Sequence, residues 1–161
     1  AMANASPASV WRQLSLMGGE RGYFYLDILW QLRGTLDWLI AGPGLCRRRP
    51  HPTELHLGDK VDFWTVIAIE PARRLTLSFD MKTPGAGVLE FELVEIEGKT
   101  ELTATAYWHP AGVWGLLYWY SLVPLHVILF EGMTKAIARR AELCAASRTR
   151  QVPVAERVLD P

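Results

Sequence analysis

The stretch that decides the fold runs from Trp108 to Cys144 and reads WHPAGVWGLLYWYSLVPLHVILFEGMTKAIARRAELC. Its first half, from Gly112 to Phe130, has 19 residues and carries no formal charge. A run of that length and composition is sufficient for a transmembrane helix. The stretch is therefore either a membrane span or the long element on which a globular core is built.

Details of the run favour the core element. Pro124 lies in its middle, His126 adds a polar side chain, and the aromatic residues gather in the first half instead of forming belts at both ends. We expect a loop and a short helix up to Val123, then a new helix with Pro124 in its first turn.

The new helix is amphipathic, with charged residues on one side and apolar residues on the other. The apolar side comprises Ile128, Leu129, Met133, Ile137 and Ala141, with Phe130 at its edge, and the charged side comprises Glu131, Lys135, Arg139 and Glu142. A one-sided helix packs on a sheet, so we expect no membrane span.

The residues before position 45 predict two shorter helices. The first follows Ser6 and Pro7, which suit an N-cap and a first helical position, and it stops at Gly18. The second covers residues 23–40, where Arg33 and Asp37 are four apart and can pair on the surface.

Between residues 59 and 108 the apolar periodicity changes to two, which is typical of strands. We expect strands at 59–70, 75–82, 88–97 and 100–108, with a bulge at Val94. Short turns join them, so the sheet is an antiparallel meander and the fold class is α+β.

The strand at 59–70 is apolar on both faces. We expect Phe63 and Ile67 to face the core, which leaves Trp64, Val66 and Ala68 as an exposed apolar patch. Such patches mark partner surfaces. This one predicts a homodimer or a docked partner protein.

Composition narrows the functional class. At 161 residues the chain is sized for one domain, which we place at residues 6–146, followed by an extended tail at 147–161. The net charge is +0, so nothing favours a nucleic acid as partner. The N-terminus lacks the features of a signal peptide and two cysteines are too few for a disulfide framework, so we expect a cytoplasmic protein.

Few residues suggest a reaction. No Cys/His cluster, nucleophile–base pattern or Gly-rich phosphate loop has a recognisable spacing, so we expect neither a metal nor a cofactor. The catalytic candidates are His126 and Asp62, whose apolar settings can move their pKa values. Near the start of its helix, His126 would have its pKa lowered by the helix dipole. The alternatives are a hydrogen-bonded structural role for His126 and a loop anchor for Asp62.

A basic, proline-broken segment, CRRRPHP, occupies residues 46–52. It is either a solvated loop or a place where one of Arg47, Arg48 and Arg49 binds an anion or covers the mouth of a pocket.

Two helices, an antiparallel sheet and a long final helix are similar to the helix-grip pattern of START-like, birch-allergen-like and polyketide-cyclase-like proteins. Three stretches resemble an uncharacterised bacterial domain family more closely: GGERGYFYLDILWQLRGTLDWLIAGPGLCRRR, LHLGDKVDFWTVIAIEPARRLTLSFDMKTPGAGVLEFEL and TATAYWHPAGVWGLLYWYSLVPLHVILFEGM. The resemblance covers residues 10–142. It implies association with short-chain-dehydrogenase-like Rossmann domains, but no established reaction.

The resemblance also implies an apolar cavity between the curved sheet and the last helix. Its expected lining residues are Trp30, Trp38, Phe63, Ile67, Leu77, Phe79, Met81, Phe91, Trp108, Leu129, Phe130 and Met133. The alternative is that these side chains fill a solid core. Helix-grip proteins usually open with a strand before the two small helices, and we expect that strand to be absent here or replaced by another segment, such as the tail.

Three functional hypotheses follow. The chain binds an apolar small molecule in the cavity, serving a reductase-like partner. Alternatively, it is a cyclase-type or isomerase-type enzyme using His126 or Asp62, or an interaction module acting through its Trp-rich sheet face.

Overall fold

The computed structural model describes residues 1–42 and 49–151. Its elements are β1 (Met2–Ala3), α1 (Pro7–Leu14), the 3-10 turn η1 (Gly19–Arg21), α2 (Asp27–Leu39), β2 (Lys60–Val61), β3 (Trp64–Glu70), β4 (Arg74–Phe79), β5 (Gly85–Ile96), β6 (Lys99–Pro110) and α3 (Gly112–Gln151). The strands form one sheet in the order β1-β6-β5-β4-β3-β2, with antiparallel neighbours throughout.

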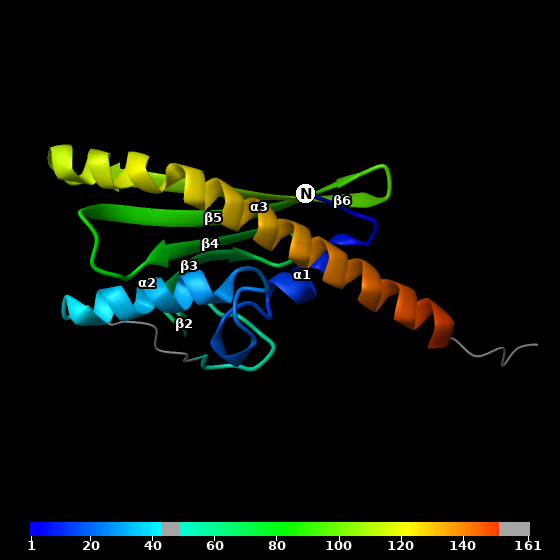
Figure 1. Cartoon of the computed structure of the whole chain (residues 1–161). Coiled ribbons are helices and arrows are strands. Elements are labelled where there is room, and N and C mark those ends of the chain that lie inside the picture. The colour runs from blue at the N-terminus through cyan, green and yellow to red at the C-terminus, as the bar shows by residue number, and fades with distance from the viewer. Residues whose placement is uncertain (43–48, 152–161) are drawn as a thin grey trace, which may run out of the picture.

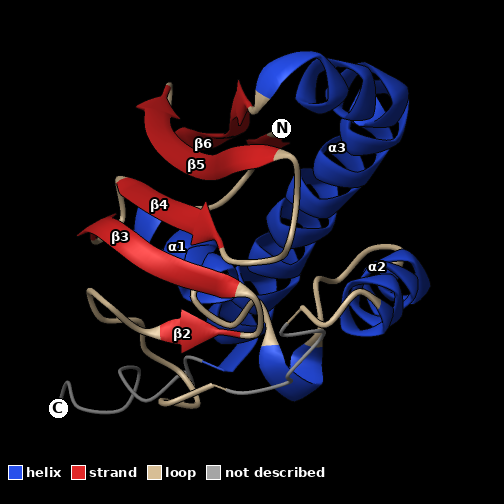
Figure 2. Ribbon diagram, turned by 90° about the vertical axis from the view of Figure 1, so that its left-hand side faces the viewer, coloured by secondary structure: helices blue, strands red, loops and turns tan. Residues whose placement is uncertain are grey.

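The helices lie against one face of this sheet. Figure 2 shows the curved strands on one side of the molecule and α2 and α3 on the other. In Figure 1, α3 runs along the whole length of the sheet and α2 lies opposite its first half. This is the helix-grip arrangement of the α+β class, so the expected fold class and the β3–β6 meander are confirmed.

The core lies between the sheet, α1 and the second half of α3. Its fully buried side chains include Leu75, Leu77, Leu89, Phe91 and Leu102 from the strands, Val10 and Leu14 from α1, and Met133 and Ile137 from α3. The alternation of Leu89, Phe91 and Leu93 along β5 therefore points inward, as the period of two predicts.

Local signals set the starts of the early helices. Ser6 caps α1, because its Oγ accepts a hydrogen bond from the backbone N–H of Ser9 at 3.4 Å. The second helix begins at Asp27 and not at Tyr23, since Phe24 and Leu26 have positive φ angles of 64° and 47° that a helix does not permit.

The expected strand at 59–70 is in fact two strands, β2 and β3. This changes which of its side chains face the core. Asp62, with φ at 57°, and Phe63 form a tight turn between β2 and β3. The turn shifts the inward parity, so Trp64 and Val66 are buried whereas the side chain of Ile67 is 46% exposed. The prediction of an exposed patch at Trp64 and Val66 was wrong.

Two other expectations about regular elements were also wrong. β5 and β6 pair without interruption from Gly85 opposite Pro110 to Ile96 opposite Lys99, so there is no bulge at Val94. α3 continues through Pro124 as one 40-residue helix. An interior proline costs about 3 kcal/mol, and here residues on both sides of it line the same cavity.

The first residues of the chain extend the sheet, and the long helix reaches Gln151. Met2 and Ala3 pair with Glu101 and Thr100 of β6, so the N-terminus supplies an edge strand. This strand lies before residue 6, and α3 extends beyond residue 147. The rest of the predicted tail, 152–161, lies outside the described residues, as do Cys46, Arg47 and Arg48.

Candidate functional site

An apolar cavity of about 210 Å³ lies between α2, the first half of α3 and the inner faces of β3 to β6. α2 contributes Leu29, Trp30, Leu32, Arg33 and Leu36; the strands contribute Trp64, Phe79, Gly87, Val88, Leu89, Ala106, Tyr107 and Trp108; and α3 contributes Tyr118, Trp119, Leu122, Leu125, His126, Leu129 and Phe130. A concave, mostly apolar site with few polar groups is the usual form of a small-molecule pocket.

Two aromatic clusters contribute to the walls of this cavity. On one wall Trp30 stacks near Phe63 at 5.7 Å between ring centroids, and Trp64 lies 5.1 Å from Phe79. On the other wall Trp108 and Trp119 stack at 5.6 Å with an interplanar angle of 5°.

The second wall continues along α3. His126 lies 5.3 Å from the ring of Trp119 and stacks on Phe130 at 5.5 Å. These three residues are spaced by seven and four, which places them on one side of the helix. This wall is thus a row of aromatic rings in contact, and the titratable imidazole of His126 lies within the row.

Three polar atoms of the lining residues have no hydrogen-bond partner among the described residues. They are Nε1 of Trp30, Nε1 of Trp64 and Nδ1 of His126, and all three are buried. A buried polar atom without a partner costs about 1–3 kcal/mol. A polar group of a bound molecule would satisfy one of these atoms.

Burial lowers the pKa of His126 from its ordinary value, because the apolar surroundings disfavour the imidazolium. The lowered pKa was expected, but its cause was not the helix dipole. His126 lies in the interior of α3, many residues from Gly112, and the dipole acts only within the first turn. The imidazole is therefore neutral near pH 7 and can accept or donate a proton.

Asp62 lies outside the cavity and anchors a loop, as one of its two sequence interpretations proposed. Its carboxylate accepts hydrogen bonds from the Gly19 backbone N–H at 3.0 Å and from the Tyr23 hydroxyl at 2.8 Å. Burial and the neighbouring Asp62 carboxylate raise the pKa of Tyr23 well above its usual value. Asp62 is thus fully engaged in holding the segment before α2.

Arg33 and Arg49 also have defined partners. Arg33 lies 3.7 Å from the buried Asp37 and donates to the Lys82 carbonyl at 3.1 Å, so the expected pair is present at the cavity edge. Arg49 donates to the carbonyls of Ser15, Met17, His51 and Glu54. It fastens a loop and does not line the cavity.

The expected lining residues divide into three groups. Trp30, Phe79, Trp108, Leu129 and Phe130 line the cavity. Phe63, Leu77, Met81, Phe91 and Met133 are buried in the core around it. Trp38 and Ile67 are exposed, at 68% and 46%, because Trp38 lies on the outer side of α2 and Ile67 follows the parity shift in β3.

Sequence reasoning missed most of the residues from α2 and from the first half of α3. The signal for α2 was present, because Leu29, Leu32, Arg33 and Leu36 recur at three-residue and four-residue spacings. The signal for α3 was hidden, because a stretch that is apolar on all sides has no preferred face.

With the geometry known, comparison with other proteins gives a family. A family model described as "Protein of unknown function (DUF2867)" matches residues 1–133. The chain belongs to the DUF2867 family. None of the curated proteins matches it. Among solved structures it is similar to CalU16 from Micromonospora echinospora, with 17% identity and a TM-score of 0.41 over 91% of this chain and 83% of that chain.

The family assignment confirms the resemblance to an uncharacterised domain family. The association with a Rossmann domain and the bacterial origin stay predictions.

This DUF2867 chain also exposes apolar side chains on α2 and on the first half of α3, which together we call the apolar rim; of these, Leu32, Leu36 and Leu125 also line the cavity. We define the rim as Ile28, Leu32, Leu36 and Leu39 of α2 together with Trp114, Leu117, Leu125 and Ile128 of α3, all of which are exposed. Among the described residues, α3 is the one helix whose length and composition would suffice to cross a membrane. Its second half packs into the core through Met133, Ile137 and Ala141, whereas most of its exposed large apolar residues lie in the first half.

Proposed function

We propose that this domain binds a small apolar molecule with one polar group in the cavity between α2, α3 and the sheet. The observation that carries the proposal is the apolar lining that contains three unpartnered nitrogen atoms, Trp30 Nε1, Trp64 Nε1 and His126 Nδ1. The apolar part of the ligand would fill the empty space, and its polar group would accept a hydrogen bond from the Trp30 N–H.

The cavity volume restricts the class of ligand. Pockets for drug-sized ligands measure about 300–1,000 Å³, whereas this cavity measures about 210 Å³. A dry cavity of about 150 Å³ holds benzene in another protein. The ligand that fits is therefore a compact molecule of one or two rings, or a longer one whose end extends past the apolar rim.

The test fills the cavity from the sheet side. Ala106 lines the cavity, whereas its neighbour Thr105 is exposed on the opposite face of β6. Ala106→Phe should abolish ligand binding, and Thr105→Phe, which adds the same ring outside, should leave it unchanged. Native mass spectrometry of mildly purified protein and a thermal-shift screen of ring compounds with one carbonyl or hydroxyl would measure this. Equal binding by both variants would contradict the proposal, as would the absence of any ligand.

The second candidate is an enzyme of cyclase or isomerase type in which His126 transfers a proton. The observation that favours it is the lowered pKa of His126 beside the cavity, which keeps the imidazole neutral and available as a base. With a ligand identified by the screen, His126→Phe should preserve binding and abolish turnover. Unchanged turnover in this variant would contradict the enzyme hypothesis, and only the binding function would remain.

We further propose that the apolar rim contacts a Rossmann-type reductase partner in the cytoplasm. This proposal replaces the prediction that a partner binds the sheet face around Trp64, because Trp64 is buried. Trp114 is 78% exposed and belongs to the rim, so it is the residue to change.

The partner test uses a purified short-chain-dehydrogenase-like protein encoded by the same genome. We expect a complex that Trp114→Lys weakens and that Glu95→Lys, an exposed change at the far end of β5, does not. Light scattering that instead finds a homodimer dissociated by Trp114→Lys would assign the rim to a second copy. Binding to lipid vesicles lost in the same variant would assign it to a membrane surface. Either result would overturn the reductase assignment.

A further inference from the structure

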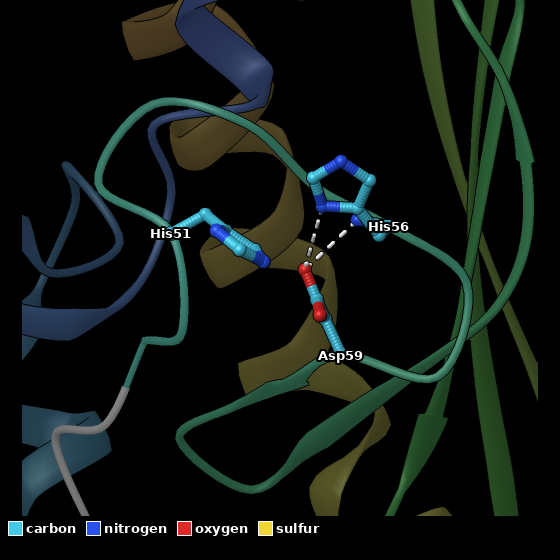
Figure 3. Close-up of side chains that lie close together, drawn as sticks. All are labelled: His51, His56 and Asp59. Carbon is cyan, nitrogen blue, oxygen red and sulfur yellow. Dashed lines mark hydrogen bonds and ion pairs between the residues drawn. The ribbon is translucent and has the colours of Figure 1, made fainter.

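The loop between α2 and β2 brings together three metal-ligating side chains that the cavity does not use. They are His51, His56 and Asp59, and one ligand atom from each lies within 4.8 Å of the others. Figure 3 shows the two imidazole rings close to each other, with the Asp59 carboxylate beside them. The ring centroids of His51 and His56 are 4.6 Å apart, and Nδ1 of His56 lies 3.6 Å from Oδ2 of Asp59.

The backbone of this loop is held in place without any ion. Arg49 donates to the carbonyls of His51 and Glu54 on the loop and to those of Ser15 and Met17 beyond α1. The guanidinium therefore clamps the segment that carries His51 to the end of the first helix.

A second set of bonds fixes the other two residues. The backbone N–H of His56 donates to Oδ2 of Asp59 at 2.8 Å, and the N–H of Asp59 donates to the His56 carbonyl at 3.1 Å. Gly58, with φ at 86°, donates to the Val66 carbonyl at 2.8 Å, which ties this turn to β3. His56 and Asp59 thus have a fixed spacing before any ion binds.

We propose that His51, His56 and Asp59 bind a divalent transition-metal ion, with Zn²⁺ as the best match. Two imidazoles and one carboxylate form a common ligand set for Zn²⁺, with bond lengths of about 2.0–2.2 Å. Tetrahedral ligands at such lengths are about 3.4 Å apart, so ligand atoms that now lie up to 4.8 Å apart must approach one another by up to about 1.4 Å. The exposed His51 and His56 rings can do this by rotating about their side-chain bonds.

Neighbouring groups support the same ion. Oδ2 of Asp59, which lies 3.6 Å from Nδ1 of His56, also accepts the hydrogen bond from the His56 backbone N–H at 2.8 Å, so an outer-shell contact holds this ligand oxygen in place. Glu54 lies 3.8 Å from Nε2 of His56 and adds a second carboxylate beside the site. Asp59 and Glu54 together outweigh the single positive charge of Arg49, whose donors are occupied by carbonyl oxygens.

The geometry leaves at least one coordination position to water, because the three residues fill three of the four positions that Zn²⁺ takes. None of the three lines the apolar cavity, so the site is distinct from the ligand site proposed above. Its ion would stabilise the folded state, since the unfolded chain does not hold the three groups together.

The experiment is isothermal titration of tag-free, chelator-treated protein with ZnCl₂. We expect one ion per chain, and binding weakened by more than about 10-fold in His51→Ala, His56→Ala and Asp59→Asn. The melting temperature should rise with Zn²⁺ in the wild type and not in these three variants. The matched control is His109→Ala, which removes an exposed histidine from β6 and should bind as the wild type does.

Co²⁺ gives a second readout, because an ion held by nitrogen and oxygen ligands in a tetrahedral site absorbs visible light far more strongly than the hydrated ion. This absorption should be present in the wild type and absent in His56→Ala. The proposal is overturned if the wild type binds Zn²⁺ only at millimolar concentration, if the three variants bind as tightly as the wild type, or if His109→Ala loses the binding.

Discussion

His126 has different proton affinities in the folded and unfolded chain. Burial lowers its pKa in the fold, whereas the unfolded imidazole titrates near about 6.5. Between these two values the unfolded state binds more protons, so the free energy of unfolding decreases as the pH falls below about 6.5 and levels off below the folded-state pKa. Above about 6.5 both states are neutral and His126 adds no pH dependence.

We therefore expect wild-type protein to lose more stability than His126→Asn when the pH is lowered from about 7.5 to about 5.5. Asparagine keeps a polar side chain but does not titrate, so the difference between the two proteins isolates the imidazole. Urea unfolding at each pH measures it, and His109→Asn, at an exposed position, should behave as the wild type does. Equal losses in wild type and His126→Asn would contradict the lowered pKa.

Asp62 is a second residue whose charge is tied to its contacts. Asp62→Asn would weaken the bonds to the Gly19 N–H and the Tyr23 hydroxyl, which are stronger with an ionised acceptor. We expect a loss of about 1–3 kcal/mol in the free energy of unfolding. The Tyr23 pKa should also decrease, because the carboxylate that raises it is gone.

Denaturant unfolding and alkaline titration of tyrosine absorbance measure these two effects. Glu95→Gln, an exposed change on β5, is the control for removing a carboxylate. A stable Asp62→Asn protein with an unchanged Tyr23 titration would show that Asp62 is not the anchor of this loop.

At the scale of an element, α3 lies close to the segment before α2, and Gly132 leaves room for the Tyr25 ring there. A Cβ atom at Gly132 would lie 2.1 Å from Cε1 of the Tyr25 ring. Alanine is favoured over glycine by about 1 kcal/mol in an isolated helix, but here the ring would have to move.

We expect Gly132→Ala to destabilise the protein by about 1–3 kcal/mol, in spite of the better helix propensity. In a Tyr25→Ala background the same change should become stabilising, because the ring is gone and only propensity remains. Thermal unfolding of the four proteins in this cycle measures the coupling. A stabilising effect in the wild-type background would mean that the Tyr25 ring moves at little cost.

The same helix shows what sequence could and could not predict about elements. The second half of α3 was predictable, because Met133, Ile137 and Ala141 recur with a helical period and are buried. The first half has no polar face to give a period. Its expected break at Pro124 is absent, and residues on both sides of the proline line the cavity. Strand parity failed at Asp62 because its positive φ inverts the facing of the residues up to Val66. A register shift between Val66 and Ala68 then restores it, so Ile69 packs against the core.

At the scale of the whole molecule, large apolar side chains divide between a closed core and an open rim. Phe91 is fully buried at the centre of the sheet, whereas Trp38 is 68% exposed on α2. Composition does not distinguish these two environments, which is why the expected site residues were a mixture of lining, core and surface positions.

We expect Phe91→Ala to lower the free energy of unfolding by about 3–5 kcal/mol, and Trp38→Ala to change it by no more than about 0.5 kcal/mol. The physical reason is the cavity that the first change leaves in a packed interior. Guanidinium unfolding of the isolated protein measures both. A large loss in Trp38→Ala would indicate that its surface is covered by a second copy in solution.

The seven tryptophans of this chain give it a built-in set of optical reporters. Trp30 and Trp64 are buried beside the cavity, and Trp108 and Trp119 are stacked on each other in its lining, whereas Trp38 and Trp114 project into solvent. Intrinsic emission is therefore a sum of blue-shifted and red-shifted populations. A molecule in the cavity would quench the first population, and a partner on the rim would shield the second from acrylamide. Single-tryptophan variants would let the two events be followed separately without attaching a label.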